Sequence, residues 1–115
     1  MVIAQGDIFW ADMGTPRGSG PGYLRPVVVL QNNTFNSTRI STVFIAILTG
    51  NISLAQRPGN VLLRVHEANL TKPSVVNISQ LFSVDKSDLM DRIGSLSPSR
   101  IREIVAGVHL LIEPG

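Results

Sequence analysis

The chain has no cysteine, and this absence excludes several functions at once. Without a thiol there is no disulfide, no thiolate nucleophile and no cysteine-based zinc site. The sequence is also poor in charge, with 16% Asp, Glu, Lys and Arg, and no apolar run approaches the length of a membrane span. The N-terminus lacks the basic segment and long apolar stretch of a signal peptide. We therefore expect a cytoplasmic protein without disulfides and without a membrane partner.

A folded domain is nevertheless indicated by what the sequence contains. Hydrophobic residues make up 43% of the 115 residues, which is enough to bury a core without covalent crosslinks. The length is close to the commonest size of a single domain. No repeat, linker or change in composition divides the chain. The prediction is one domain that spans residues 1–115.

The net charge of +2 is spread unevenly along the chain. Residues 1–64 carry five arginines and two aspartates, whereas residues 65–115 carry five basic and six acidic residues. Eight of the ten basic residues are arginine, whose guanidinium pairs with phosphate through two hydrogen bonds and stacks on bases. This choice suits a polyanion such as nucleic acid, although a mildly basic surface has the same composition.

Short apolar segments bounded by Gly, Pro, Asn and Ser predict a mainly β fold. We expect strands at residues 6–11, 25–31, 41–49, 61–68, 74–84 and 91–96, and one helical turn at 85–90. The second and third strands are apolar at consecutive positions, which indicates burial on both faces. The polar segments between the strands, at 12–24, 32–38 and 50–60, are expected to be loops.

A single amphipathic helix is predicted at the C-terminus. Ser97 is a good N-cap, and Pro98 suits the first helical position. Apolar residues then recur at helical spacing and predict one stripe that packs on the sheet: Ile101, Ile104, Val105, Val108, Leu111 and Ile112. The fold class is therefore mainly β with a C-terminal helix, arranged as a small, strongly curved antiparallel sheet or partial barrel.

Most motifs that could carry chemistry are incomplete. The stretch GSGPG at 18–22 lacks the Lys-Ser/Thr pair and the following helix of a phosphate-binding loop. Nothing brings His66 and His109 together as an acid–base pair. The aspartates of DKSDLMD at 85–91 lack the glycine and glutamate of a calcium loop, and no GxSxG motif is present. We expect no metal and no cofactor.

Two polar residues stand where the apolar strands end. Arg25 is the last polar residue before the run VVVL, and Thr49 ends the run VFIAILT. An arginine and a hydroxyl on rigid strand ends could together hold a phosphate. The Gly- and Pro-rich stretch at 15–22 is predicted to be a mobile segment that lies over Arg25.

Several segments resemble one known family when taken together. GDIFWAD at 6–12, GYLRPVVVLQNN at 22–33 and TVFIAILT at 42–49 resemble the MazF/PemK family of toxin endoribonucleases. The resemblance continues through SVVNISQLFSVDKSDL at 74–89 and covers roughly residues 4–112. It implies a compact SH3-like sheet of the PemK/CcdB type with a C-terminal helix, assembled as a homodimer. This agrees with the strands and helix expected from the residues alone.

The resemblance also implies an activity and its residues. The family cleaves single-stranded RNA, usually mRNA, at short motifs without a metal. The ribose 2′-hydroxyl attacks and leaves a 2′,3′-cyclic phosphate and a 5′-hydroxyl. The catalytic positions match Arg25 and Thr49. Positions that match candidate RNA-binding residues follow: Tyr23, Gln31, Asn32, Gln80 and Phe82. Relatives often carry a basic residue at the position of Phe82, which here either stacks on a base or belongs to the core.

The implied partner is a small MazE-like antitoxin whose acidic, partly disordered C-terminal tail occupies the RNA groove. Two alternatives use the same fold. A CcdB-type gyrase inhibitor ends in Trp-Gly-Ile, whereas this chain ends in LIEPG and its only tryptophan is Trp10. A non-catalytic SH3-like binding module is the other alternative.

Overall fold

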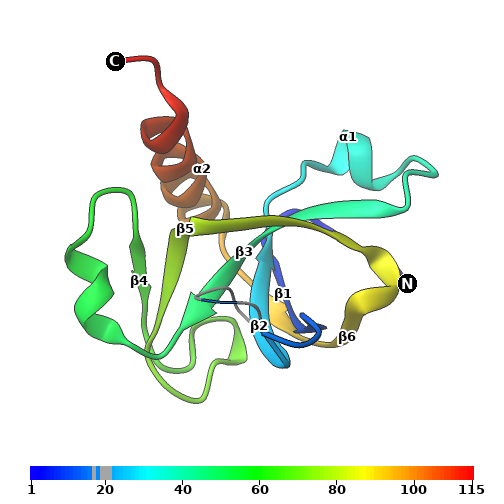
Figure 1. Cartoon of the computed structure of the whole chain (residues 1–115), viewed down its shortest axis with the longest axis horizontal. Coiled ribbons are helices and arrows are strands. Elements are labelled where there is room, and N and C mark those ends of the chain that lie inside the picture. Colours follow the sequence, from blue (N-terminus) through cyan, green and yellow to red (C-terminus); the bar gives the residue numbers. More distant parts are fainter. Residues whose placement is uncertain (17, 19–21) are drawn as a thin grey trace.

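A strongly curled antiparallel sheet with one long helix forms the molecule (Figure 1). The computed structural model describes residues 1–16, 18 and 22–115. Within these residues, six strands are ordered β4-β5-β3-β2-β1-β6. Their bounds are β1 (Asp7–Asp12), β2 (Leu24–Val29), β3 (Thr42–Thr49), β4 (Val61–Leu63), β5 (Ser74–Asp85) and β6 (Leu89–Ser95). The helices are α1 (Asn33–Asn36) and α2 (Pro98–Ile112), with 3₁₀ turns η1 (Ile52–Gln56), η2 (Glu67–Asn69) and η3 (Lys86–Asp88).

The curl of the sheet depends on β5, which arches across the molecule (Figure 1). Along the β3–β5 pair, Ala46 lies opposite Leu81 but the next residue, Ile47, lies opposite Asn77. Residues 78–80 therefore have no partner on β3. Such a bulge bends a strand and increases its twist. The sheet closes into a half-barrel, as the sequence predicted.

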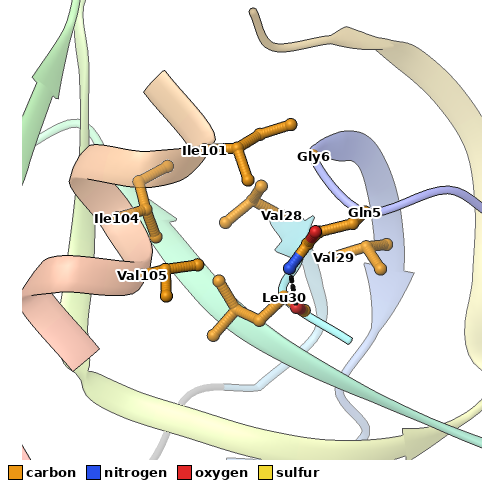
Figure 2. A pocket seen from close by; sticks show the side chains of 8 residues that line it. All are labelled: Gln5, Gly6, Val28, Val29, Leu30, Ile101, Ile104 and Val105. Atoms are coloured by element: carbon orange, nitrogen blue, oxygen red, sulfur yellow. Dashed lines mark hydrogen bonds between the residues drawn. The ribbon is translucent and has the colours of Figure 1, made fainter. Parts of the chain in front are cut away.

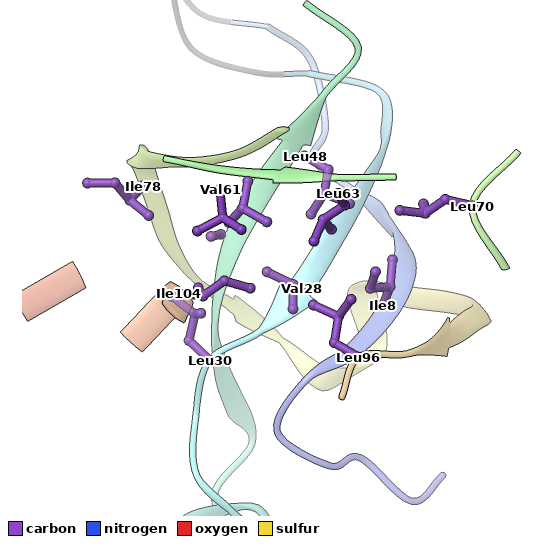
Figure 3. Close-up of a cluster of buried hydrophobic side chains, with 12 residues drawn as sticks. Ile8, Val28, Leu30, Leu48, Val61, Leu63, Leu70, Ile78, Leu96 and Ile104 are labelled. Carbon is purple, nitrogen blue, oxygen red and sulfur yellow. The ribbon is translucent and has the colours of Figure 1, made fainter. Parts of the chain in front are cut away.

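Two apolar cores lie on opposite faces of the sheet. The central strands separate them, because successive side chains of a strand alternate between faces. Val27, Val28 and Val29 are at most 1% exposed, which confirms the expected strand buried on both faces. The first core lies toward α2 and β4 (Figure 3): Ile8, Val28, Leu30, Ala46, Leu48, Val61, Leu63, Leu70, Val76, Ile78, Leu96 and Ile104. The second core lies inside the curl: Ile3, Phe9, Ala11, Val27, Val29, Val43, Ile45, Ile47 and Leu89.

Helix α2 begins as the sequence predicts. The Ser97 hydroxyl accepts a hydrogen bond from the backbone N–H of Arg100 at 3.3 Å, and Pro98 occupies the first turn. Ile101, Ile104 and Val105 pack toward β2 and the N-terminal turn (Figure 2). No helix in the described ranges is long and apolar enough to cross a membrane.

The buried stripe of α2 is shorter than predicted. Leu111 and Ile112 are 49% and 67% exposed, and Leu110 beside them is 59% exposed. The physical reason is visible in Figure 1, where the C-terminal end of the helix runs past the sheet. The apolar residues of α2 follow the predicted helical period, but the sheet beneath the helix does not extend as far as Leu110.

The predicted strand at 61–68 is also too long. Strand β4 ends at Leu63, and the Arg64 backbone N–H is bound by the Glu67 carboxylate at 3.0 Å. A side chain that accepts a hydrogen bond from a backbone N–H competes with the strand-to-strand hydrogen bond that the same N–H would otherwise make. The chain then turns through three left-handed residues, His66, Ala68 and Asn69, with φ of 72°, 50° and 62°.

Three predicted loops differ in detail. The segment at 32–38 contains helix α1, whose N-cap Asn32 accepts the Phe35 N–H at 3.3 Å. The segment at 50–60 contains η1, and the segment at 12–24 contributes Leu24 to β2. The prediction of a mobile segment at 15–22 includes residues 17 and 19–21, which lie outside the described residues.

Candidate active site

Strand register brings Arg25 and Thr49 to one end of the sheet. Val27 of β2 pairs with Ile47 of β3, and the register is antiparallel. The paired positions end at Val27 and Ile47, and two residues further along each strand come Arg25 and Thr49, so both lie at the same end of the sheet. Side chains two residues apart along a strand point to the same face, so Arg25 and Thr49 share the face of Val27 and Ile47. We call this end of β2 and β3 the Arg25 end.

Arg25 and Thr49 continue the face that forms the second core. Val27 and Ile47 are buried there, at 0% and 2% exposure, and the next side chains on the same face are Arg25 and Thr49. Arg25 is exposed and Thr49 is half-buried. The two polar groups thus lie where two strands with buried central residues reach the surface. Such a support keeps a side chain in place better than a loop does.

Both polar groups keep hydrogen-bonding capacity that no contact within the described residues takes up. Among the described residues, the Arg25 side chain makes no hydrogen bond and no ion pair. The Thr49 hydroxyl oxygen accepts the Asn51 backbone N–H at 3.2 Å. A hydroxyl that accepts through its oxygen still has its proton to donate. The pair can therefore offer a cationic fork and a neutral donor to one anionic group.

Gln31 and Asn32 lie at the opposite end of β2, which we call the Gln31 end. The Gln31 amide donates to the Asn36 side chain at 3.0 Å and to the Thr42 carbonyl at 3.2 Å, and it accepts the Phe44 N–H at 3.2 Å. Asn32 caps α1. The structure therefore does not bring these two residues to Arg25, and both side chains already have partners that fix the local backbone.

The other three candidate RNA-binding residues have different surroundings. Tyr23 is 70% exposed, has φ of 59° and stands two residues before Arg25. Gln80 lies in the unpaired part of β5 and accepts a hydrogen bond from the Asn77 amide at 3.5 Å. Phe82 is half-buried, lies opposite Ile45 and packs against the second core. The ring of Phe82 is thus engaged in packing, and only part of its surface is available to a base.

The histidines occupy separate elements. His66 belongs to the turn after β4, and its backbone N–H donates to the Leu70 carbonyl at 2.7 Å. His109 lies on α2, beside Phe44 and Ile112 in a surface pocket. Within the described ranges, no group of three or more His, Asp or Glu side chains is arranged to hold a metal ion.

Sequence reasoning missed the structural role of the GDIFWAD motif. The Asp7 carboxylate is buried, at 5% residue exposure. It accepts the Ser95 hydroxyl at 2.6 Å and the Ala4 N–H at 3.0 Å, and Arg92 lies 3.6 Å away. This aspartate thus fixes the N-terminal turn to β6. The sequence alone carried no sign of its partners, because Ser95 is 88 residues away.

Sequence reasoning also missed the segment at 64–72, which is built into a rigid turn. Arg100 of α2 binds Glu67 through its Nε at 2.6 Å and its Nη2 at 3.1 Å. This hydrogen bonding lowers the pKa of Glu67 below its usual value and raises that of Arg100. Further along, the Lys72 ammonium lies 3.6 Å from the point that a Cβ on Gly50 would occupy. Gly50 follows Thr49, so Lys72 belongs to the Arg25 end.

Comparisons with known proteins show that this fold belongs to a class of small β toxins. A family model described as the PemK-like, MazF-like toxin of type II toxin–antitoxin systems matches residues 4–112. The chain is 40% identical to endoribonuclease MazF2 of Mycobacterium bovis and to endoribonuclease MazF6 of Mycobacterium tuberculosis. Each match spans 98% of this chain and 99% of the relative. The chain therefore belongs to the MazF endoribonuclease family, the PemK-like toxins of type II toxin–antitoxin systems.

Solved structures show the same fold. MazF from Deinococcus radiodurans matches with a TM-score of 0.80 at 18% identity, over 99% of each chain. The Mycobacterium tuberculosis toxin MazF-mt6 matches with a TM-score of 0.77 at 19% identity, over 95% of this chain and 98% of that one. A mycobacterial endoribonuclease in complex with its cognate antitoxin matches with a TM-score of 0.74 at 21% identity, over 98% of each chain.

Proposed function

We propose that this chain is the toxin of a toxin–antitoxin pair and cleaves single-stranded RNA, mRNA in the cell, at short sequence motifs. Arg25 and Thr49 hold the phosphate at which the strand is cut. One observation supports this proposal: strands β2 and β3, paired through Val27 and Ile47, bring these two residues to the same end of the sheet, next to buried strand residues. Family membership over residues 4–112 supports the reaction class.

The proposed reaction is an in-line displacement at phosphorus. The ribose 2′-oxygen forms a bond to phosphorus and loses its proton, while the bond from phosphorus to the 5′-oxygen breaks and that oxygen gains a proton. The products are a 2′,3′-cyclic phosphate and a 5′-hydroxyl. No metal or cofactor takes part in these steps.

Arg25 contributes mainly through charge. Negative charge builds on the non-bridging oxygens of the phosphate as the new bond forms. A guanidinium fixed beside them stabilises this charge more strongly in the transition state than in the ground state. A guanidinium has five N–H donors and no acceptor, so Arg25 is suited to stabilise charge and not to act as the base. The Thr49 hydroxyl donates a second hydrogen bond to the same phosphate.

The same reasoning extends to the partners. The toxin works in the cytoplasm as a homodimer, and the exposed apolar end of α2, with Leu110, Leu111 and Ile112, is a surface that a second copy would cover. A small MazE-like antitoxin neutralises it by placing an acidic tail against the Arg25 end. Two structural neighbours described as toxin–antitoxin complexes are compatible with this arrangement.

The decisive experiment is RNA cleavage by the purified protein with EDTA present. We expect cuts at a short motif, with cyclic phosphate and 5′-hydroxyl ends, and far slower cleavage by the Arg25→Ala variant. Wild-type protein that leaves RNA intact but poisons DNA gyrase would instead favour the CcdB-type function. Binding without any cleavage would favour a non-catalytic module.

A further inference from the structure

A small pocket next to the Arg25 end has no role in the reaction described above. Its volume is about 150 Å³, and its apolar wall is formed by Trp10, Pro26 and Ile93. Its polar side is formed by Asn69, Lys72 and Ser74, from the rigid turn and the start of β5. We propose that this pocket takes one base of the RNA, next to the phosphate held by Arg25 and Thr49. This inference rests on the proposed function.

Strand register fixes the pocket beside the catalytic pair. Trp10 lies opposite Pro26, and the next pair along β1 and β2 is Ala11 opposite Arg25. By alternation, Trp10 and Pro26 lie on the face of the sheet opposite to Arg25. The pocket and the catalytic pair are therefore one residue apart along β2, at the same end of the sheet. A strand that crosses this end can place a phosphate on one face and the adjoining base on the other.

Lys72 connects the two places. Its ammonium lies against Gly50, the residue that follows Thr49, and Lys72 also lines the pocket. A lysine in this position can bind the phosphate that joins the seated base to the cut site. A polyanionic occupant fits this charge, whereas an uncharged ligand would leave Lys72 without a role. The pocket is thus continuous with the proposed RNA site in both position and charge.

The shape of the pocket favours a single base. Its volume is well below the roughly 300–1,000 Å³ of drug-sized ligand sites, so it admits one ring system. Trp10 is 40% exposed and offers an indole face, on which every base can stack. The Asn69 amide donates to the Ile93 carbonyl at 3.1 Å, which holds this polar group in place at the rim.

The pocket is also preformed. Its outer wall includes the turn that Glu67 ties to α2, and a Cβ on Gly94 of β6 would collide with the Ala68 carbonyl of that turn. Three residues of the turn keep left-handed backbone angles, which cost energy unless the surroundings hold them. The hydrogen bonds and close packing of this turn fix the shape of the pocket wall beside the exposed Trp10. A pocket of fixed shape is suited to select its ligand by shape.

The chain offers its own reporter, because Trp10 is its only tryptophan. Wild-type protein first cleaves a mixed-sequence transcript, which tests the proposed function and maps the motif. A short RNA with that motif and a 2′-deoxy ribose at the cut site is then titrated against Trp10 fluorescence. We expect the emission to be quenched as the base stacks on the indole.

Variants at two positions test the pocket, and their binding is measured with a dye-labelled copy of the same RNA, because the Trp10 variants lack the tryptophan reporter. Trp10→Leu should bind this RNA roughly tenfold more weakly and lose selectivity for one base next to the cut, whereas Trp10→Phe should keep most of both. Lys72→Gln should bind several-fold more weakly, and its plot of log affinity against log salt should be shallower by about 0.7. Lys86→Gln removes the only other lysine of the chain and is the matched control.

The outcomes separate the two proposals. If the wild type cleaves RNA but its fluorescence does not change, and Lys72→Gln matches Lys86→Gln, the pocket is no base site and the function stands. If the wild type neither binds nor cleaves RNA, both proposals fall. Quenching by a short peptide of alternating Glu and Leu, but not by RNA, would assign the pocket to a protein partner. Lys72 is exposed, so its variant remains informative if Trp10→Leu does not fold.

Discussion

The two ends of strand β2 are both polar, but they differ in how much of that polarity the fold uses. At the Gln31 end, the Gln31 side chain makes three hydrogen bonds and Asn32 caps α1. At the Arg25 end, the Arg25 side chain makes none within the described residues. A side chain whose hydrogen bonds hold the backbone has few donors or acceptors left for a ligand. An exposed arginine at the end of a strand still has all of its donors available. The difference separates structural from functional polarity.

The largest effect should come from the exposed arginine. Arg25→Ala should lower the rate of RNA cleavage by about a hundred- to a thousand-fold, because one preorganised donor to the transition state is lost. Its free energy of unfolding should stay within about 0.5 kcal/mol of wild type, since the side chain is exposed. Arg25→Lys should also cleave poorly, because a point charge cannot replace the planar fork. Single-turnover kinetics and urea unfolding test both statements, and a variant that cleaves normally would refute the assignment.

Thr49 should show a smaller loss of the same kind. Thr49→Val removes the hydroxyl and keeps the shape, so we expect cleavage to fall by about ten- to a hundred-fold with KM nearly unchanged. Loss of the bond from Asn51 should cost about 1 kcal/mol of stability or less. Thr49→Ser, which keeps the hydroxyl, is the control and should retain most activity. Equal rates for the Val and Ser variants would remove Thr49 from the reaction.

At the other end of β2 the pattern should reverse. Gln31→Leu leaves the Phe44 N–H and the Thr42 carbonyl without their side-chain partner. We expect a loss of roughly 1–3 kcal/mol in the free energy of unfolding, measured by urea denaturation, with RNA cleavage unchanged at a temperature where the variant is folded. A variant with normal stability and reduced cleavage would mean that Gln31 binds RNA and that the two ends of β2 are alike.

The smallest effect concerns the turn that flanks the Arg25 end. Arg100 lowers the pKa of Glu67, so the ion pair stabilises the folded state when Glu67 is charged. This stabilisation is present above the unfolded pKa, near 4.5, and is lost as pH falls through the lower folded pKa. Glu67→Gln should thus be less stable than wild type by about 1 kcal/mol at pH 7, after allowance for partial exposure.

The pH series supplies the contrast. The stability difference between wild type and Glu67→Gln should shrink as pH is lowered below about 4.5. Glu103→Gln is the natural comparison, because Glu103 also contacts Arg100 at 3.1 Å but is 53% exposed. Its variant should change stability little at any pH. A Glu67→Gln difference that does not vary with pH would show that the loss is one of packing and not of charge.

The sequence by itself determined the pieces whose physics is local. Consecutive valines in β2, the N-cap and proline of α2 and the apolar strand at 42–49 each set their own structure, because burial and capping act within a few residues. The same segments showed that Arg25 and Thr49 are the polar residues at the ends of apolar strands. The family resemblance then implied that these two residues are catalytic. That the second and third strands would be buried on both faces also followed from their composition.

Tertiary structure alone decided the features that depend on contacts between residues far apart in the chain. Whether Gln31 faces a ligand or holds the backbone depends on Thr42 and Phe44, and β4 ends at Leu63 because Glu67 takes the next N–H. The reach of α2 past the sheet and the pocket beside Trp10 arise from the placement of whole elements. Side-chain hydrogen bonds and packing act across space, so a sequence pattern that records only neighbours along the chain cannot contain them.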